Sequence, residues 1–250
     1  MNAPSSGTRV GPEGAAPYVF ANSDCGGLRT AVGSAEALLR VSGALWLAAE
    51  RALVVADLHL EKGSSYAQRG QLLPPYDTRE TLRRLTVEIA ALAPAVVILL
   101  GDTFHDRCSE GRLAPDDAQA LRDLARGRAL IWVVGNHDAD GPRALPGEVV
   151  ADLGLCGLTL RHEPLPGLRP GEVAGHLHPA ARVRAASGSV RRRCFVTDGE
   201  RAILPAFGAY AGGLNVRDAA FNGLFARLPL AGALGRGRVH AVGWRSLAGD

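Results

Sequence analysis

The sequence predicts an α/β fold in which one largely parallel β-sheet packs against a second, more antiparallel sheet. In the first half of the chain, short and continuously apolar runs alternate with segments of helical periodicity. Such runs are typical of strands buried on both faces, and their alternation with helices is typical of a parallel sheet with right-handed crossovers. In the second half, short apolar runs are separated by Gly, Pro and Asp-Gly turns instead, which favours antiparallel neighbours.

The strands of the first half are predicted from these apolar runs. Residues 36–49 and 52–57 are predicted to form two strands joined at Glu50 and Arg51. The second of these strands begins with an unbroken apolar stretch, as expected of a strand buried on both faces. Two further buried strands are predicted from equally apolar runs, at residues 95–100 and 130–134.

Two helices are predicted between these strands. Asp77 begins the first, with Glu80 at the spacing of a capping box, and Pro94 ends it. Its buried face is marked by apolar residues at helical spacing, namely Leu82, Leu85, Ile89 and Leu92. Pro115 begins the second helix and Gly127 ends it, because proline is favoured in the first turn of a helix and glycine just past the last.

The second half is predicted to contain short strands at residues 158–161, 172–174, 193–197 and 201–204. Asp198-Gly199 separates the last two runs, and this dipeptide between apolar runs is a strong signal for a β-hairpin. We therefore expect a second sheet, more antiparallel than the first and packed against it.

Composition excludes several classes of protein. The chain of 250 residues is 47% hydrophobic and 21% charged, as in ordinary globular proteins, and it has no apolar run approaching the roughly 20 residues of a membrane span. The N-terminus lacks the pattern of a secretory signal and the four cysteines form no Cys-x-x-Cys pair, so we expect free thiols in the cytoplasm. Residues 1–20, rich in Pro, Gly and Ser, are expected to be a flexible tail, and residues 21–250 a single domain.

Polar residues of a few types follow the predicted strands at their carboxyl ends. They are Asp57 and His59, Asp102, Asn136 with His137 and Asp138, His162, and His176 with His178. Because the carboxyl ends of parallel strands form the ligand crevice of an α/β sheet, we expect these side chains to meet in one place. Of the seven histidines, only His240 lies away from these segments.

These residue types indicate a site for two metal ions. Residues two apart on an extended strand point the same way, so Asp57 and His59 are expected to bind one ion together, as are His176 and His178. The full set of candidate ligands is Asp57, His59, Asp102, Asn136, His162, His176 and His178. This set is too large for one tetrahedral ion and suits two ions that share a bridging carboxylate, an arrangement used for attack on phosphorus. A mixture of carboxylate, amide and imidazole favours Mn²⁺, Fe or Zn²⁺ over Ca²⁺.

Each of these motifs alone has an ordinary structural interpretation. Gly-Asp is usually a turn, Gly-Asn-His-Asp is also compatible with a turn at positive φ, and a lone histidine such as His162 is more often structural. The joint pattern argues against coincidence, because all five motifs occur in one chain, in one order, each at the end of an apolar strand.

Together these motifs resemble the five motifs of the calcineurin-like metallophosphoesterase superfamily, over residues 57–178. Over residues 30–216 the chain is similar in particular to the bacterial PdeM subfamily, the ligase-associated DNA-damage-response endonucleases. The segments that carry this second resemblance are Asp-Leu-His-Leu-Glu-Lys at 57–62, Leu-Pro-Pro-Tyr-Asp-Thr at 73–78, Gly-Asp-x-Phe-His-Asp at 101–106, and Leu-Pro-Ala-Phe-Gly with Gly-Gly at 204–213. The resemblance implies the metallophosphoesterase fold, a four-layer αββα sandwich of two mixed β-sheets flanked by helices.

The resemblance also implies a role for each motif residue. One metal would be held by Asp57, His59 and His178, the other by Asn136, His162 and His176, with Asp102 bridging them. His137 would not bind metal but would meet the scissile phosphate and protonate the leaving oxygen, and Asp138 would orient His137. The physical chemistry agrees, since two cations lower the pKa of a bridging water to give a hydroxide nucleophile near neutral pH, and an imidazolium can supply the proton.

We therefore expect a metal-dependent phosphoric ester hydrolase with two divalent ions, Mn²⁺ before Fe or Zn²⁺. Its expected substrate is DNA, cleaved by a phosphodiesterase or endonuclease that acts in repair, and the resemblance adds a DNA-repair ligase or helicase as a partner. No membrane partner is expected. Two alternatives stay open: an enzyme for small phosphodiesters or nucleotides, and a non-catalytic scaffold or binding protein of the same fold. The scaffold is disfavoured because every ligand position is filled.

Candidate substrate contacts are predicted from basic residues near the motifs. A basic cluster follows the last motif and consists of Arg182, Arg184, Arg191, Arg192 and Arg193. Its last three members are predicted to contact a phosphate backbone, with a solvated strand edge as the ordinary alternative. Lys62, the single lysine, is predicted to contact phosphate or else to be a cation at a helix start. For His105 and Asp106, support of the metal site and packing of a turn are both open.

Overall fold

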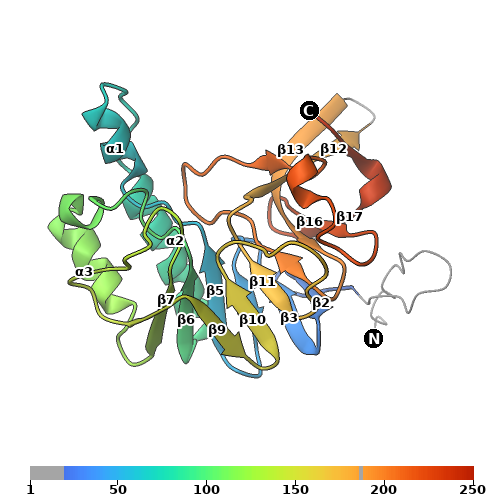
Figure 1. The fold of residues 1–250 in the computed structure, drawn as a ribbon, viewed down its shortest axis with the longest axis horizontal. Coiled ribbons are helices and arrows are strands. Elements are labelled where there is room, and N and C mark those ends of the chain that lie inside the picture. Colours follow the sequence, from blue (N-terminus) through green and yellow to red (C-terminus); the bar gives the residue numbers. More distant parts are fainter. Residues whose placement is uncertain (1–19, 186–187) are drawn as a thin grey trace.

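The computed structural model describes residues 20–185 and 188–250. Over these residues the chain forms two mixed β-sheets packed face to face, with helices on the outer side of the first sheet (Figure 1). The predicted fold class is therefore confirmed. On the outer side of the second sheet the described residues form only short 3₁₀ turns, η2 (Ala219–Phe221) and η3 (Trp244–Ser246).

The first sheet has the strand order β1-β2-β3-β4-β5-β6-β7-β8. Its strands are β1 (Ala21–Asn22), β2 (Leu28–Val32), β3 (Ala35–Leu39), β4 (Leu45–Leu47), β5 (Ala52–Ala56), β6 (Val96–Leu100), β7 (Ala129–Val133) and β8 (Glu148–Val150). Strands β1 to β5 pair antiparallel, and β5 to β8 pair parallel as predicted. The prediction of one strand over residues 36–49 is wrong, because the chain turns between β3 and β4 at Gly43, whose φ of 97° favours glycine.

Helices connect the parallel strands on the outer side. They are α1 (Lys62–Gln68), α2 (Asp77–Leu92) and α3 (Pro115–Asp123). The start of α3 at Pro115 confirms the prediction, whereas the capping box of Asp77 and Glu80 is wrong, because α2 has Tyr76 at its N-cap and no side-chain cap. Asp77 instead accepts a hydrogen bond from the backbone N–H of Gly63 at 3.0 Å, which ties the start of α2 to α1.

The second sheet has the order β15-β12-β13-β14-β11-β10-β9, and β16, β17 and β18 pair alongside it. Its strands are β9 (Asp152–Leu155), β10 (Leu158–Arg161), β11 (Glu172–Ala174), β12 (Pro179–Ala185), β13 (Gly188–Thr197), β14 (Ala202–Ile203), β15 (Leu214–Asn215), β16 (Leu230–Leu234), β17 (Val239–Gly243) and β18 (Leu247–Ala248). The predicted hairpin at Asp198-Gly199 is confirmed, with Thr197 paired to Ala202. Strand β13 begins well before its predicted start at residue 193, because the arginines of its first half interrupt the apolar pattern.

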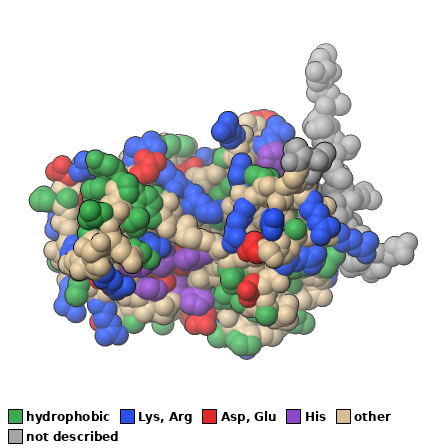
Figure 2. Space-filling view, turned by 90° about the horizontal axis from the view of Figure 1, so that it is seen from above, with side chains coloured by type: hydrophobic (Ala, Val, Ile, Leu, Met, Phe, Trp, Pro, Cys, Tyr) green, Lys and Arg blue, Asp and Glu red, His purple; other side chains and the backbone are tan. Residues whose placement is uncertain are grey.

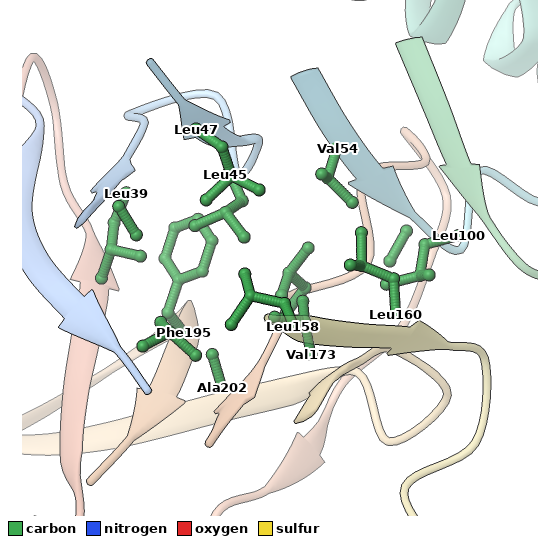
Figure 3. Packing of buried hydrophobic residues seen from close by; sticks show 14 of the residues in the cluster. Leu39, Leu45, Leu47, Val54, Leu100, Leu158, Leu160, Val173, Phe195 and Ala202 are labelled. Atoms are coloured by element: carbon green, nitrogen blue, oxygen red, sulfur yellow. The ribbon is translucent and has the colours of Figure 1, made fainter. Parts of the chain in front are cut away.

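The core between the sheets fixes how they face each other. Alternate residues of a strand point to opposite sides of a sheet, so Val54 of β5 lies in this core while Leu53 packs toward the helices. Phe195 of β13 is fully buried in the same core and lies beside Leu39 and Leu45 of the first sheet (Figure 3). Side chains of both sheets thereby share one core, which holds the sheets face to face.

The remaining sequence expectations concern the chain as a whole. The predicted tail, residues 1–20, lies outside the described residues except for Phe20, whose side chain is buried in the core between the sheets. The four cysteines are free thiols. Within the described ranges, no helix has both the length and the apolar character needed to cross a bilayer.

Candidate metal centre

The seven candidate ligands all lie at the edge where the parallel strands of the two sheets end. The first sheet supplies Asp57 and His59 after β5, Asp102 after β6 and Asn136 after β7, and the second sheet supplies His162 after β10 and His176 and His178 after β11. Seen from above, histidine side chains gather at this edge (Figure 2). The structure therefore brings together every ligand that the sequence singled out.

Asp57, His59 and His178 form a first cluster. Nε2 of His178 lies 3.1 Å from Nε2 of His59 and 3.4 Å from Oδ1 of Asp57. One donor atom of each residue lies within 4.8 Å of the other two. Asp57 is fully buried and His59 is 6% exposed, so these atoms converge as the ligands of one ion would.

Asn136, His162 and His176 form a second cluster. Oδ1 of Asn136 lies 2.8 Å from Nε2 of His162 and 3.1 Å from Nδ1 of His176. The two imidazole nitrogens are themselves 3.1 Å apart. His162 is buried whereas Asn136 is exposed, so this cluster is open to solvent on one side.

Asp102 lies between the two clusters. Its Oδ1 is 3.4 Å from Nε2 of His162, and its Oδ2 is 3.9 Å from Nε2 of His59. The carboxylate is almost completely buried. Its two oxygens thus face different clusters, which is the arrangement that a bridging ligand requires.

The chemistry of the clusters fits two cations. Among the described residues, no Lys or Arg forms an ion pair with the buried carboxylates of Asp57 and Asp102, and buried anions are costly unless a positive charge offsets them. Burial, and after it the neighbouring ring of His178, lowers the pKa of His59 to about 2. That ring is therefore neutral and has a lone pair for a metal. Nδ1 of His59 and Nδ1 of His162 are buried without a hydrogen-bond partner.

The backbone at the ligands is left-handed. Among the described residues, φ lies between 44° and 65° at Asp57, His59, Asp102, His176 and His178. Such values are uncommon outside glycine and cost on the order of 1–3 kcal/mol each. The prediction that extended spacing directs His176 and His178 to one ion is wrong, because the turns at these two residues send their rings to different clusters.

Glycines beside the ligands leave room for them. A Cβ on Gly101 would lie 2.2 Å from Nδ1 of His162, and one on Gly135 would lie 2.2 Å from Oδ1 of Asp102. A Cβ on Gly175 would lie 2.6 Å from Oδ2 of Asp57. These glycines of the motifs are therefore steric requirements of the site.

His137 lies beside Asp102 but outside both clusters. Its Nδ1–H donates to the carbonyl of His105 at 2.6 Å, and the two rings stack with centroids 5.4 Å apart. Asp138, expected to orient the His137 ring, instead accepts from the backbone N–H of Gly135 at 2.9 Å and of Phe104 at 3.1 Å. Asp138 therefore fixes the loop, and the backbone of His105 orients the ring.

The sequence left the role of His105 open, and the structure places it in the site. Its ring nitrogen belongs with those of His59 and His137 to a third convergent group. Burial, followed by the charge of Lys62, lowers the pKa of His105 to about 4. Lys62 itself donates to the carbonyl of Tyr210 at 3.2 Å. The sequence feature that could have predicted this position of His105 is the concentration of histidines in and beside the motifs.

The three consecutive arginines do not form one patch. Arg193 donates to the carbonyls of Ala206 and Gly208, each at 2.9 Å, and is therefore turned inward. Arg191 is exposed and pairs with Asp250 at 2.8 Å. Arg192 is exposed too, but it points to the face of β13 opposite to that of Arg191 and Arg193, because successive residues of a strand alternate. The expectation of a joint phosphate contact by all three is not met.

Comparison with known proteins agrees with the geometry. A family model described as calcineurin-like phosphoesterase matches residues 50–194, which include all seven candidate ligands. The crystal structure of Pseudomonas putida nuclease MPE is similar with a TM-score of 0.68 and 31% identity, covering 86% of this chain and 100% of that one. The structure of Yfce, a phosphoesterase from E. coli, has a TM-score of 0.39 and 15% identity, covering 77% of this chain and 98% of the other. Comparison with curated protein sequences gave no match.

Metal loading tests the two-cluster arrangement. The purified protein is expected to bind two Mn²⁺ per chain and to unfold at a higher temperature when they are bound, because a ligand that binds only the folded state stabilises it. Asp102→Ala is expected to lose metal and the thermal shift together, since it removes the carboxylate between the clusters. Asp123→Ala, an exposed aspartate on α3, is the control. Elemental analysis that finds a single ion in the loaded wild type would contradict the arrangement.

A pair of glycine variants tests the steric requirement separately. Gly101 and Gly127 have matched φ values of 73° and 69°, but a Cβ on Gly127 would meet nothing within 4 Å. Gly101→Ala is therefore expected to displace His162 and lower the metal content to one ion or less, whereas Gly127→Ala keeps two. Equal metal content in the two variants would show that the contact with His162 is unimportant.

Proposed function

The chain belongs to the calcineurin-like phosphoesterase family and is a metal-dependent phosphoester hydrolase, and we propose that it cleaves phosphodiester bonds of nucleic acid, with DNA as the substrate. The observation that carries this proposal is the position of His137. Its Nε2 lies 3.9 Å from Oδ2 of Asp102, and its side chain is 39% exposed beside buried ligands. A proton donor is thus available to a substrate held at the edge by the metals.

The residues of the site have distinct tasks in this proposal. Asp57, His59 and His178 would hold one ion and Asn136, His162 and His176 the other, with Asp102 between the two sets of ligands. Two bound divalent ions lower the pKa of water and offset the negative charge that builds up on phosphorus. Because a carbonyl accepts at Nδ1 of His137, that nitrogen carries a hydrogen, and in the imidazolium form the second proton is on Nε2. Nε2 faces the metal edge and delivers its proton to the leaving oxygen.

The choice of nucleic acid is supported by the similarity to a nuclease and by the openness of the site. The structure of nuclease MPE aligns with 86% of this chain at 31% identity. Asn136 and His137 are accessible at the edge, and Lys62 lies close enough to His105 to lower the pKa of that ring. Figure 2 shows further Lys and Arg side chains on the face where the histidines gather. Manganese is the ion that we propose, since imidazole, amide and carboxylate ligands suit it. A role in DNA repair, beside a ligase or helicase, completes the proposal.

His137→Ala tests the proton donor. The variant is expected to keep both metals and to lose roughly 10²–10⁴-fold in kcat, the usual contribution of general acid catalysis. Elemental analysis and steady-state rates on one chromogenic diester measure both quantities. His240→Ala, the histidine remote from the motifs, is the control. Loss of metal in His137→Ala would mean that this residue is a ligand after all.

A substrate comparison tests the proposed activity. Loaded with Mn²⁺, the enzyme is expected to cleave single- or double-stranded oligodeoxynucleotides, and a chelator is expected to abolish the cleavage, because both clusters then lose their ions. Gel analysis of end-labelled oligonucleotides gives the products. Hydrolysis of a small chromogenic diester without any cleavage of oligonucleotides would replace the proposal with the small-molecule alternative.

A further inference from the structure

The hairpin of β12 and β13 separates its arginines onto two faces. Arg182 is paired directly with Arg191, and Arg184 with Ser189. Directly paired residues of an antiparallel ladder point to the same face, as do residues two apart on one strand. Arg182, Arg184 and Arg191 therefore share one face, here named the arginine row. Arg192 points to the opposite face.

The face of the arginine row turns toward the metal centre. Residues 191, 193 and 195 of β13 lie on one face of the strand. Phe195 is packed in the core between the sheets (Figure 3). Arg193, between Phe195 and Arg191 on this face, donates to the carbonyl of Gly208 at 2.9 Å. The N–H of Gly208 in turn donates to the carbonyl of Asp57 at 3.1 Å. This face of β13 therefore carries a core residue at Phe195, then Arg193 next to the backbone that contacts Asp57, and then Arg191 of the arginine row.

The row also begins close to the metal centre along the chain. Strand β12 starts at Pro179, immediately after His178. A strand rises about 3.3 Å per residue, so the Cα atom of Arg182 lies about 13 Å from that of His178 along the strand direction, and the Cα atom of Arg184 about 20 Å. Residues two apart are about 6.6 Å from each other, a step similar to that between successive phosphates of an extended strand.

The arginines of the row are available for a ligand. Arg184 and Arg191 are exposed and Arg182 is partly buried. Arg191 pairs with Asp250 through side chains that are 45% and 53% exposed, and such surface pairs contribute only about 0–1 kcal/mol. Phosphate oxygens can replace this partner. Arg182 also donates to Oγ of Ser189 and to the carbonyl of Gly249, and Arg191 donates to the carbonyl of Gly213. A guanidinium has five N–H groups, so both side chains keep donors for a phosphate. Arg193 is partly buried and donates to the carbonyls of Ala206 and Gly208.

We propose that the arginine row binds the phosphodiester backbone of a polynucleotide that leaves the metal centre along β12. This inference rests on the proposed function and adds to it the path of the substrate. Planar guanidinium groups at a regular spacing suit a chain of phosphates, because each forms paired hydrogen bonds with two phosphate oxygens. Figure 2 shows Lys and Arg side chains on the face where the histidines gather.

The test compares the triple variant Arg182→Ala/Arg184→Ala/Arg191→Ala with Arg192→Ala. The probe is a single-stranded oligodeoxynucleotide of about twelve nucleotides. Its binding is measured over a series of salt concentrations with Mn²⁺-loaded protein in which His137→Ala is added to every variant and to the reference, so that the probe is bound but cleaved slowly. Each phosphate contact to a single strand adds about 0.7 to the slope of log K against log salt. The triple variant is therefore expected to have a slope smaller by about 2, and to lose roughly 10- to 100-fold in affinity at low salt. Arg192→Ala is expected to keep the wild-type slope.

A second readout uses substrate length. The ratio of kcat/KM for the oligonucleotide to that for a dinucleotide is expected to fall at least about tenfold in the triple variant, because a dinucleotide is too short to reach the row. Metal content and unfolding temperature of each variant show whether it folds as the wild type does.

The possible failures are distinguishable. If the wild type cleaves no oligonucleotide, the proposed function fails and the path of the substrate with it. If the wild type cleaves the oligonucleotide and the triple variant has the wild-type slope and length ratio, only the arginine row is refuted. A fall of the slope by about 0.7 in Arg192→Ala, the value of one lost phosphate contact, would refute the assignment of the contacts to one face.

Discussion

Every candidate ligand depends on the parallel, in-register pairing of strands in both sheets. Ala56 of β5 lies opposite Leu100 of β6, which lies opposite Val133 of β7, so the three strands end at one level. In the second sheet β10, β11 and β14 are parallel too. Each ion cluster takes ligands from both sheets, since His178 joins Asp57 in the first and Asn136 joins His162 in the second. The core that holds the sheets face to face is therefore also what assembles the metal centre.

The same arrangement has an energetic cost, which backbone N–H groups of His176 and His137 offset in part by donating to Asp57 and Asp102. Buried carboxylates at Asp57 and Asp102 and the left-handed backbone at the ligands both disfavour the folded chain without cations. Two cations bound at the clusters would supply the missing positive charge, and their binding free energy would add to that of folding. Stability and metal binding would then be linked through the same few side chains.

The sequence predicts the two sheets and the residues of the metal centre well, because both leave local patterns. Apolar runs mark β5, β6 and β7, and polar motifs mark their ends. Other features depend on backbone turns and register that no local pattern reveals. Spacing along an extended strand would send His176 and His178 to one ion, whereas the resemblance to known motifs assigned them to different ions, as their positions in the two clusters do. The inward turn of Arg193 follows from a partner loop that is distant in sequence. Asp77 has the spacing of a cap but bonds to Gly63, because α1 packs beside the start of α2.

The position of Lys62 has a practical consequence for handling the protein. It is the only lysine of the chain, and its ammonium group lies against the carbonyl of Tyr210 and close enough to His59 and His105 to lower their pKa values. Amine-reactive dyes, cross-linkers and biosensor surfaces therefore have one side chain to attack, next to the metal centre. Coupling through this lysine would place a label or a matrix beside the metal centre, so immobilisation through a tag keeps the edge open.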